Sequence, residues 1–341
     1  MDNRAEIREF LATRRAKITP EQAGLQPGGG RRRVPGLRRE EVAVLAGVST
    51  EWYVRLEKGH ISGVSDEVLG AAARALQLDE AERLHLFDLA RAAKPSRPPR
   101  RRTRQAVRPS VLRILESMTG TPAFVRNARL DVLAINPLGR ALYSPVFEDP
   151  ARPANLARFC FLDPVSRDFY PGWDDVARAT VALLRSQAGR DPYNRELTDL
   201  VGELATRSEE FRGWWAEHDV RLHQTGTKHF RHPVVGLLDV SFDSMPLPAR
   251  EDHDLTMTCY TAEPGSSSDD ALKLLASWAA SATPSPDRDT AVGECQGTRG
   301  SAQWRSWEVP AGGHRICPLM ATRRARVAIS AGSPPVPRWP G

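Results

Sequence analysis

Four cations lie close together between Leu37 and Gly59, namely Arg38, Arg39, Arg55 and Lys58. Guanidinium and ammonium groups of this kind contact the phosphates of a polyanion, which sets register and affinity without reading a base sequence. We therefore expect phosphate contacts from all four side chains. For Arg55, pairing with a carboxylate within its own domain is the alternative.

Four further side chains lie at the start and on the outward side of a predicted helix: Ser49, Thr50, Glu51 and Val54. Thr50 offers a hydroxyl and a methyl group, and Glu51 can accept a hydrogen bond from a cytosine amino group. An acid in the first turn of a helix is equally well explained by the helix dipole. We expect these four residues to reach base edges in the major groove of DNA.

Two short helices, 38–46 and 50–58, must position these side chains. Ala43 is small, as the crossing of the two helices requires, and Gly47 suits the left-handed turn between them. Ser49 can cap the second helix, whose positive dipole end then favours phosphate. The apolar anchors fall at the spacing that a helix-turn-helix needs: Val42, Leu45, Val48, Tyr53 and Leu56. A purely structural helical hairpin is the alternative.

The chain divides into four predicted parts. Residues 1–93 form the helix-turn-helix domain, in which 6–17, 65–76 and 79–92 complete the set of helices. Residues 94–109 are basic and rich in proline, as a semi-extended linker is. Residues 110–281 form a second domain. Residues 282–341 show no sustained period and are expected to be disordered.

Charge is distributed unevenly over these parts, although the net charge of the 341 residues is only +6. Residues 1–108 carry a balance of +8 and residues 109–281 a balance of −6, so only the front of the chain is expected to meet a polyanion. No apolar run is long enough for a membrane span and no signal peptide is visible, so we expect no membrane partner. The four cysteines form no Cys-x-x-Cys pair and suit free thiols in the cytoplasm.

The second domain mixes helical and strand patterns. Apolar runs at 123–126 and 130–135 flank Asn127-Ala128-Arg129 and predict a hairpin. The remaining expected elements are listed here: helices at 111–119, 136–143, 174–187, 195–207, 209–217 and 268–280, and strands at 227–232, 237–242 and 255–261. These elements predict an all-α domain at the start of the chain, followed by an α+β domain.

Two groups of motifs resemble one family. Residues 33–43 (RVPGLRREEVA) and 47–49 (GVS) resemble the lambda-repressor-like, or Xre-type, helix-turn-helix regulators of the MmyB-like branch. The resemblance continues in the second domain at Thr121–Val125, Leu133–Pro137 and Phe211–Trp215, and in the segments 226–233 and 260–266. Trp52 departs from it, because a tyrosine is more usual there.

The resemblance implies a PAS-like α+β sensor domain with an apolar pocket for a fatty-acid-like ligand. It also implies a DNA-binding transcription regulator, without an enzymatic activity or a further cofactor, that binds operator DNA as a homodimer. Six aromatic residues are our candidates for ligand contact: Phe124, Phe161, Tyr170, Trp214, Phe230 and Tyr260. Aromatic side chains are more often plain core than pocket wall, so each also has a structural interpretation.

Other chemistry finds less support in the sequence. His218, His223, His229 and His232 lie within fifteen residues, but their spacing fits no zinc pattern. No nucleophile elbow, Walker A loop or His-Glu-x-x-His motif is present. The alternative to a regulator is an enzyme or a protein-interaction scaffold, in which residues 110–281 act and the helical domain only recruits.

Overall fold

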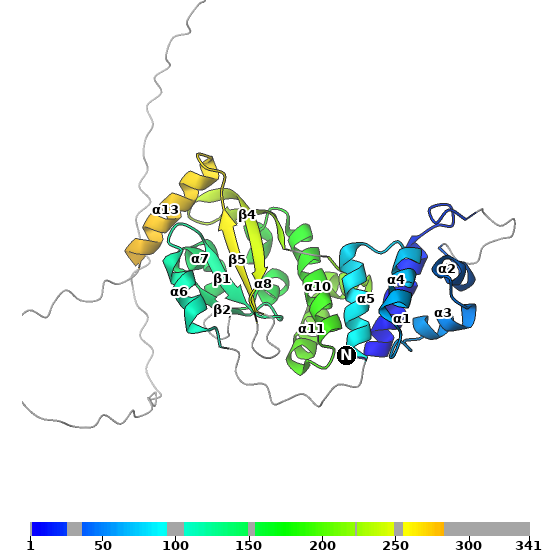
Figure 1. Cartoon of the computed structure of the whole chain (residues 1–341). Coiled ribbons are helices and arrows are strands. Elements are labelled where there is room, and N and C mark those ends of the chain that lie inside the picture. The colour runs from blue at the N-terminus through cyan, green and yellow to red at the C-terminus, as the bar shows by residue number, and fades with distance from the viewer. Residues whose placement is uncertain are drawn as a thin grey trace, which may run out of the picture. The chain divides into compact units, whose positions relative to one another are not determined.

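The structure is a computed structural model, and it describes residues 2–25, 36–93, 106–148, 154–221, 224–248 and 255–282 (Figure 1). These residues all belong to one compact unit, Met1–Ser285. The loop 26–35, residues 94–105 of the predicted linker and residues 283–341 of the predicted tail lie outside the described residues. None of the helices within the described ranges is both long and apolar enough to cross a membrane.

The first part of the chain is all helical. Its elements are α1 (Asn3–Lys17), α2 (Arg39–Ala46), α3 (Thr50–Glu57), α4 (Asp66–Ala75) and α5 (Glu80–Ala92). The side chains of Ser49, Ser65 and Asp79 each accept a hydrogen bond from a backbone N–H of the first turn, as predicted. Helix α1 begins three residues before the predicted start, because Asp2 caps it in the same way.

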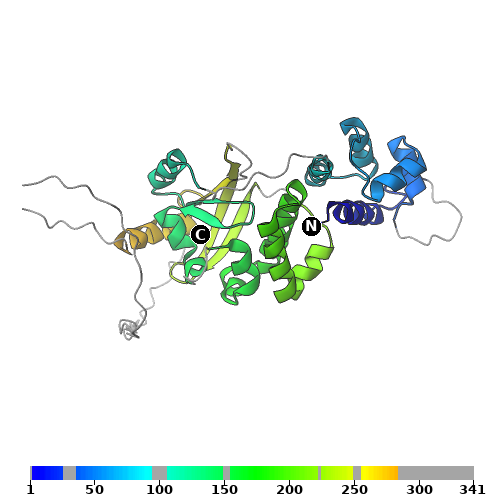
Figure 2. The same ribbon diagram turned by 90° about the horizontal axis from the view of Figure 1, so that it is seen from below.

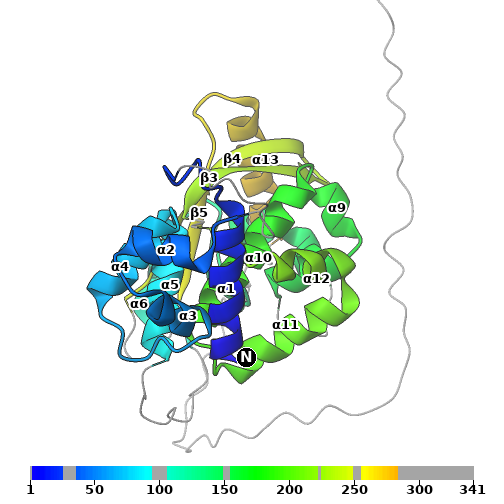
Figure 3. The ribbon, with the colours of Figure 1, turned by 90° about the vertical axis from the view of Figure 1, so that its right-hand side faces the viewer.

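One apolar core holds these five helices together. Helix α1 packs against α3 and α5 (Figure 3) and buries Ile7, Phe10 and Leu11 completely. The predicted anchors Val42 and Tyr53 are also fully buried. These three α1 residues have the i, i+3, i+4 spacing that places them on one face of the helix, and that face is buried, as in an amphipathic helix.

The second part combines helices with one sheet. Its helices are α6 (Pro109–Ser117), α7 (Pro137–Leu142), α8 (Leu156–Leu162), α9 (Val165–Phe169), α10 (Trp173–Arg190), α11 (Arg195–Arg207), α12 (Glu209–Ala216) and α13 (Ser267–Ala282), with a 3₁₀ turn at Ser144–Phe147. The strands are β1 (Ala123–Arg126), β2 (Val132–Ile135), β3 (Thr225–His232), β4 (Gly236–Pro246) and β5 (Thr256–Thr261).

The sheet is antiparallel throughout, with the order β2-β1-β5-β4-β3. Strands β1 and β2 form the predicted hairpin, and β3 and β4 form a second one. Helices α7 to α12 and the 3₁₀ turn lie between β2 and β3 in the chain. The sheet therefore pairs the first hairpin with the last strand, which brings β1 beside β5.

The two faces of the sheet are covered differently (Figure 2). Helix α6 covers one face, where Val111 and Leu115 pack against Val125 and Met257. The opposite face carries the aromatic side chains of β1, β3, β4 and β5 and packs against α7 to α10 and α13. Because side chains alternate along a strand, every second residue of β1 and β3 points to this aromatic face.

Some predictions of element bounds are corrected by the structure. Helices α8 and α9 and the 3₁₀ turn were not predicted, because each is too short to show a helical period. Pro109 begins α6 rather than ending the linker, since proline is well suited to the first turn of a helix. Ala282, assigned to the disordered tail, is the last residue of α13.

Candidate ligand pocket and nucleic-acid interface

The turn between α2 and α3 has the geometry that the sequence predicts. Gly47 adopts a left-handed conformation with φ of 67°, and its N–H bonds back to Val44 O. Ser49 Oγ accepts a hydrogen bond from Trp52 N at 3.1 Å. Ala43 is buried at the contact of the two helices. The start of α3 is thereby fixed in place.

The predicted DNA-contacting residues lie mostly on the surface of this turn and of α3. Seven are exposed, namely Arg38, Arg39, Ser49, Thr50, Glu51, Arg55 and Lys58, whereas Val54 is half-buried. Exposure leaves their polar groups available to a partner. Whether each contacts a base or a phosphate stays a prediction.

Arg39 differs from the other cations because it is bound within the domain. Its Nη2 and Nε lie 2.9 and 3.1 Å from Oε1 of the buried Glu57. Arg15 donates to both oxygens of the same carboxylate through Nε and Nη2, at 2.9 Å each. Burial alone would raise the pKa of Glu57, but these guanidinium groups lower it, so the carboxylate stays ionised. This cluster joins α1, α2 and α3.

A cavity of about 140 Å³ lies on the aromatic face of the sheet, against α8 and α10. Its walls from the sheet include Phe124, Phe242 and Tyr260, and those from helices include Cys160 and Val176. The complete lining also contains Arg126, Leu130, Leu156, Tyr170, Asp175, Ala179, Thr180, Leu183, Thr227, Lys228, Ser244 and Thr258. The walls are thus largely apolar, with a few polar groups among them, as in small-molecule sites.

Two cations stand out in this apolar lining. Arg126 retains only 7% of its exposed surface, and burial lowers its pKa to about 10. Among the described residues no carboxylate forms an ion pair with Arg126 or with Lys228. A buried cation without an anion is costly, so such a group is well placed to receive an anionic ligand.

Lys228 is half-buried among aromatic rings. Its Nζ donates a hydrogen bond to Tyr143 Oη at 3.3 Å and lies 5.0 Å from the ring centre of Tyr170. Burial lowers the pKa of Lys228 to about 8. The hydroxyls of Tyr143 and Tyr260 are 2.5 Å apart, and burial raises the pKa of both, so they stay neutral.

The six predicted ligand-contacting residues lie in three places. Phe124, Tyr170 and Tyr260 line the cavity. Phe230 lies behind it, packed against the rings of Tyr170 and Tyr260. Phe161 and Trp214 pack against Trp173 and Phe211, where the aromatic core meets a neighbouring apolar cluster.

Sequence reasoning missed Arg126 and Lys228, although a signal for both was present. Arg126 comes two residues after Phe124, and Lys228 comes two residues before Phe230, and both phenylalanines lie in predicted strands. Residues i and i+2 of a strand share one face. An aromatic residue assigned to the pocket therefore implies that its neighbour two positions away faces the same way.

The histidines considered for metal binding lie in separate environments. His218 contacts Glu6 and Glu9, whereas His229 pairs with Asp239 and His232 bonds to the backbone of Ala141. His223 lies outside the described residues. Within the described part of the chain no group of three or more His, Cys, Asp or Glu side chains could hold a metal ion.

Comparison with known families matches both parts of the chain. Residues 6–86, which contain most of α1 to α5, match a family of helix-turn-helix domains. Residues 107–275, which contain the sheet and the pocket, match the MmyB-like transcription regulator ligand binding domain. No curated protein matches the chain at a significant level. The two matches confirm the predicted resemblance, and the chain belongs to the helix-turn-helix transcription regulators that carry an MmyB-like ligand-binding domain.

Proposed function

We propose that this regulator binds operator DNA as a homodimer and that its pocket takes an apolar molecule with an anionic end, such as a fatty acid. The family supports ligand sensing, and the chemistry of the cavity supports this class of ligand. The antiparallel order of the five strands supports a PAS-like sensor domain. Because DNA is the partner, we place the protein in the cytoplasm.

The observation that carries the proposal is Arg126 in the apolar wall. A hydrocarbon chain gains free energy by leaving water for such a wall, at about 25 cal/mol per Å² of buried apolar surface. A carboxylate at one end of that chain would compensate the buried guanidinium through charge-assisted hydrogen bonds. Lys228 lines the same cavity and supplies a second cation.

The proposal for DNA follows from the surface of α3. Thr50 and Glu51 are exposed in its first turn and are our candidates for base contacts. Arg38, Arg55 and Lys58 are exposed and are our candidates for phosphate contacts. A dimer would place two such helices on paired half-sites, which is how domains of this class gain affinity.

An enzymatic role would need a nucleophile or a base in the cavity. Burial raises the pKa of the Cys160 thiol to about 12, so it is not a thiolate at neutral pH. The tyrosines Tyr143 and Tyr260 are held neutral in the same way. The Cys160 thiol and the two tyrosine hydroxyls are therefore hydrogen-bonding groups rather than nucleophiles.

The test uses the full-length chain. Native mass spectrometry before and after organic extraction reports any ligand that copurifies, and titration with dodecanoate measures affinity. We expect Arg126→Met to weaken dodecanoate binding by about 30-fold or more, as for loss of one partner of a buried charge pair. Arg195→Met, at a side chain that is 93% exposed, is the matched control. Equal binding of dodecanoate and its methyl ester would contradict the proposal.

A further inference from the structure

Two segments of the ligand-binding domain contact the helix-turn-helix domain. Helix α10 packs against α5. The chain that leaves α12 turns at His218, which adopts a positive φ of 54°, uncommon for a residue other than glycine. Two residues later Val220 is buried in the same apolar cluster as Ile7 and Phe10 of α1. The core of the helix-turn-helix domain thus includes a residue of the ligand-binding domain.

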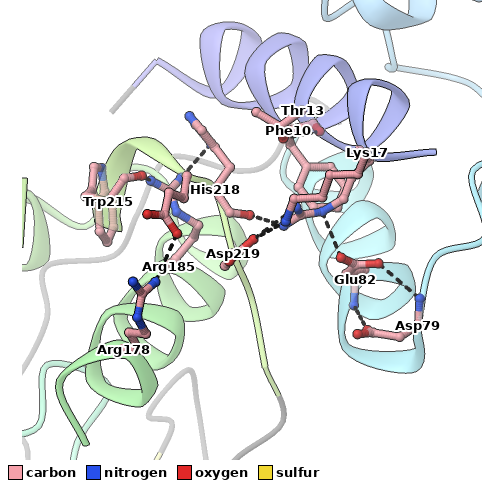
Figure 4. A network of polar contacts seen from close by, with 12 residues as sticks. Phe10, Thr13, Lys17, Asp79, Glu82, Arg178, Arg185, Trp215, His218 and Asp219 are labelled. Atoms are coloured by element: carbon pink, nitrogen blue, oxygen red, sulfur yellow. Dashed lines mark hydrogen bonds and ion pairs between the residues drawn. The ribbon is translucent and has the colours of Figure 1, made fainter. Parts of the chain in front are cut away.

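Arg185 of α10 holds one group of polar contacts at this junction, and Figure 4 shows it beside His218 and Trp215. Its side chain is fully buried, pairs with Glu6 of α1 and donates to the backbone oxygen of Trp215. His218 Nδ1 lies 2.9 Å from Arg185 Nη1 and 3.2 Å from Glu6 Oε1. Burial would raise the pKa of Glu6, but His218, His85 and Arg185 hold it well below its usual range, so Glu6 stays ionised.

A second set of ion pairs crosses the junction beside this one. Arg14 of α1 binds Asp219 at 3.1 Å and Glu82 of α5 at 2.9 Å, and Lys17 binds Asp219 at 2.6 Å. Figure 4 shows Asp219 between Lys17 and the Arg185 group. Each domain therefore supplies both anions and cations, which differs from a simple attraction of a basic domain to an acidic one.

Close packing adds to the ion pairs where α10 meets α5. A Cβ atom on Gly189 of α10 would lie 2.4 Å from Cε1 of His85, well inside van der Waals contact. His85 is itself buried, so its ring has little room to move. Gly189 is therefore needed for the contact between the domains and not for the helix that contains it.

Helix α10 also forms a wall of the pocket. Val176, Ala179, Thr180 and Leu183 line the cavity from the preceding turns of the helix that carries Arg185. We propose that α10 transmits the state of the pocket to the DNA-binding domain, because one rigid helix contacts the ligand cavity on one side and is locked to α1 and α5 by Arg185, Glu6 and Gly189 on the other. The proposal rests on the proposed function only for the identity of the ligand.

The packing of α10 against α5 lets a movement of one helix reach the other. Packed helices with buried ion pairs do not deform continuously, so a displaced α10 must either move α5 with it or separate from it. Separation breaks the Arg185–Glu6 pair and exposes the apolar contact of Val220 with α1 to water, which is unfavourable. A ligand can shift this equilibrium only by binding the two arrangements with different affinities.

The first experiment measures amide hydrogen exchange in the full-length chain. We expect Glu6→Gln to accelerate the exchange of α5 and α10 by roughly 100-fold, since one partner of a buried pair is lost. Glu80→Gln is the matched control, because Glu80 forms an exposed ion pair with Arg83 within α5. Unchanged exchange in α10 on Glu6→Gln would overturn the assignment of the lock.

Gly189→Ala separates the junction from the folding of either domain. Alanine favours the interior of a helix over glycine, so α10 alone should become more stable. We expect faster exchange in α5, across the junction, together with unchanged or slower exchange in the part of α10 that precedes Arg185, from Ala177 to Leu184. Slower exchange on both sides would overturn the role of Gly189.

The pocket is then probed with dodecanoate. We expect dodecanoate to protect the pocket residues of β1 and α10 and also to change the exchange of α5, the latter effect being absent in Gly189→Ala. Protection of the pocket without any change in α5 would overturn the coupling. If dodecanoate protects nothing, the proposed ligand is wrong, and Ala179→Phe, which fills the cavity from α10, decides the coupling by the same measurement on α5.

Discussion

The two cations of the pocket, Arg126 and Lys228, differ in the pH at which they lose their proton. Burial lowers the pKa of Arg126 to about 10 and that of Lys228 to about 8. Arg126 therefore stays charged at any physiological pH, whereas Lys228 begins to lose its proton just above neutrality. An anionic ligand would always meet one cation in the cavity and would meet the second only below about pH 8.

This difference predicts the pH dependence of ligand binding. A carboxylate favours the protonated form of Lys228, so its affinity should fall as the pH rises through about 8, by about tenfold at pH 9. Lys228→Met should bind more weakly at pH 7 and lose this dependence. Calorimetric titration with dodecanoate at pH 7 and pH 9 measures both. A wild-type affinity that stays constant over this range would remove Lys228 from the site.

For single residues, the sequence predicts that a large aromatic side chain is buried better than it predicts which neighbours that side chain packs against. Phe124, Tyr170 and Tyr260 could be chosen because large aromatics must be buried somewhere near the sheet, and they do line the cavity. Phe161 and Trp214 could not be separated from them, since these two aromatics differ only in lying between two adjacent apolar clusters, away from the cavity lining. Helix packing decides that, and packing is not visible in a single sequence.

Among the elements, α3 is held by a charge cluster as well as by its cap. Glu57, its last residue, binds Arg15 of α1 and Arg39 of α2. The orientation of α3 within the domain is therefore fixed at both of its ends, by Ser49 at the start and by Glu57 at the end. The same cluster gives Arg39 a structural contact that its neighbour Arg38 lacks.

This contact predicts different outcomes for two adjacent arginines. Arg38→Ala should reduce the salt slope of binding to a random-sequence duplex by about 0.9 and leave thermal stability unchanged, because its side chain makes only an exposed contact with Glu40. Arg39→Ala should also cost about 1–2 kcal/mol of stability, because Glu57 loses hydrogen bonds.

Salt-dependent anisotropy and thermal denaturation separate the two effects. Arg91→Ala, at an exposed side chain near the end of α5, controls for the loss of a positive charge elsewhere in the domain. Equal loss of stability for Arg38→Ala and Arg39→Ala would show that the Glu57 cluster does not distinguish them.

A helix could be predicted from the sequence wherever apolar residues recur with the helical period and a capping residue precedes them. Helix α11 has both and matches its predicted bounds, 195–207. Helices α8 and α9 are too short to show a helical period, so the sequence offered no basis for assigning them. The order of the strands also lay beyond the sequence, because it depends on pairings between residues more than a hundred positions apart.

At the scale of the whole molecule, the main feature is the junction between the helix-turn-helix domain and the ligand-binding domain. In the sequence, a charge balance of +8 on residues 1–108 and of −6 on residues 109–281 distinguishes a basic front from an acidic second part. The structure instead joins them through α10, the segment at His218 and Val220, and ion pairs of both polarities. A buried contact of this kind makes the stability of each domain depend on the other.

This dependence predicts cooperative unfolding of the two domains. Differential scanning calorimetry of the full-length chain should show one transition, because unfolding one domain exposes the buried surface and the charges of the other. Gly189→Ala should divide it into two transitions by opposing the contact with His85. Two well-separated transitions in the wild-type chain would mean that the junction contributes little to stability.

Val220 also has a consequence for synthesis on the ribosome. The five helices of the N-terminal domain are complete when Ala92 has been made, yet one residue of their core is still to come. At about 5–20 residues per second, the chain from there to Val220 takes roughly 6–26 s to emerge. During that interval the nascent N-terminal domain exposes the apolar site that Val220 will fill, and its final form awaits translation of a codon that belongs to the second domain.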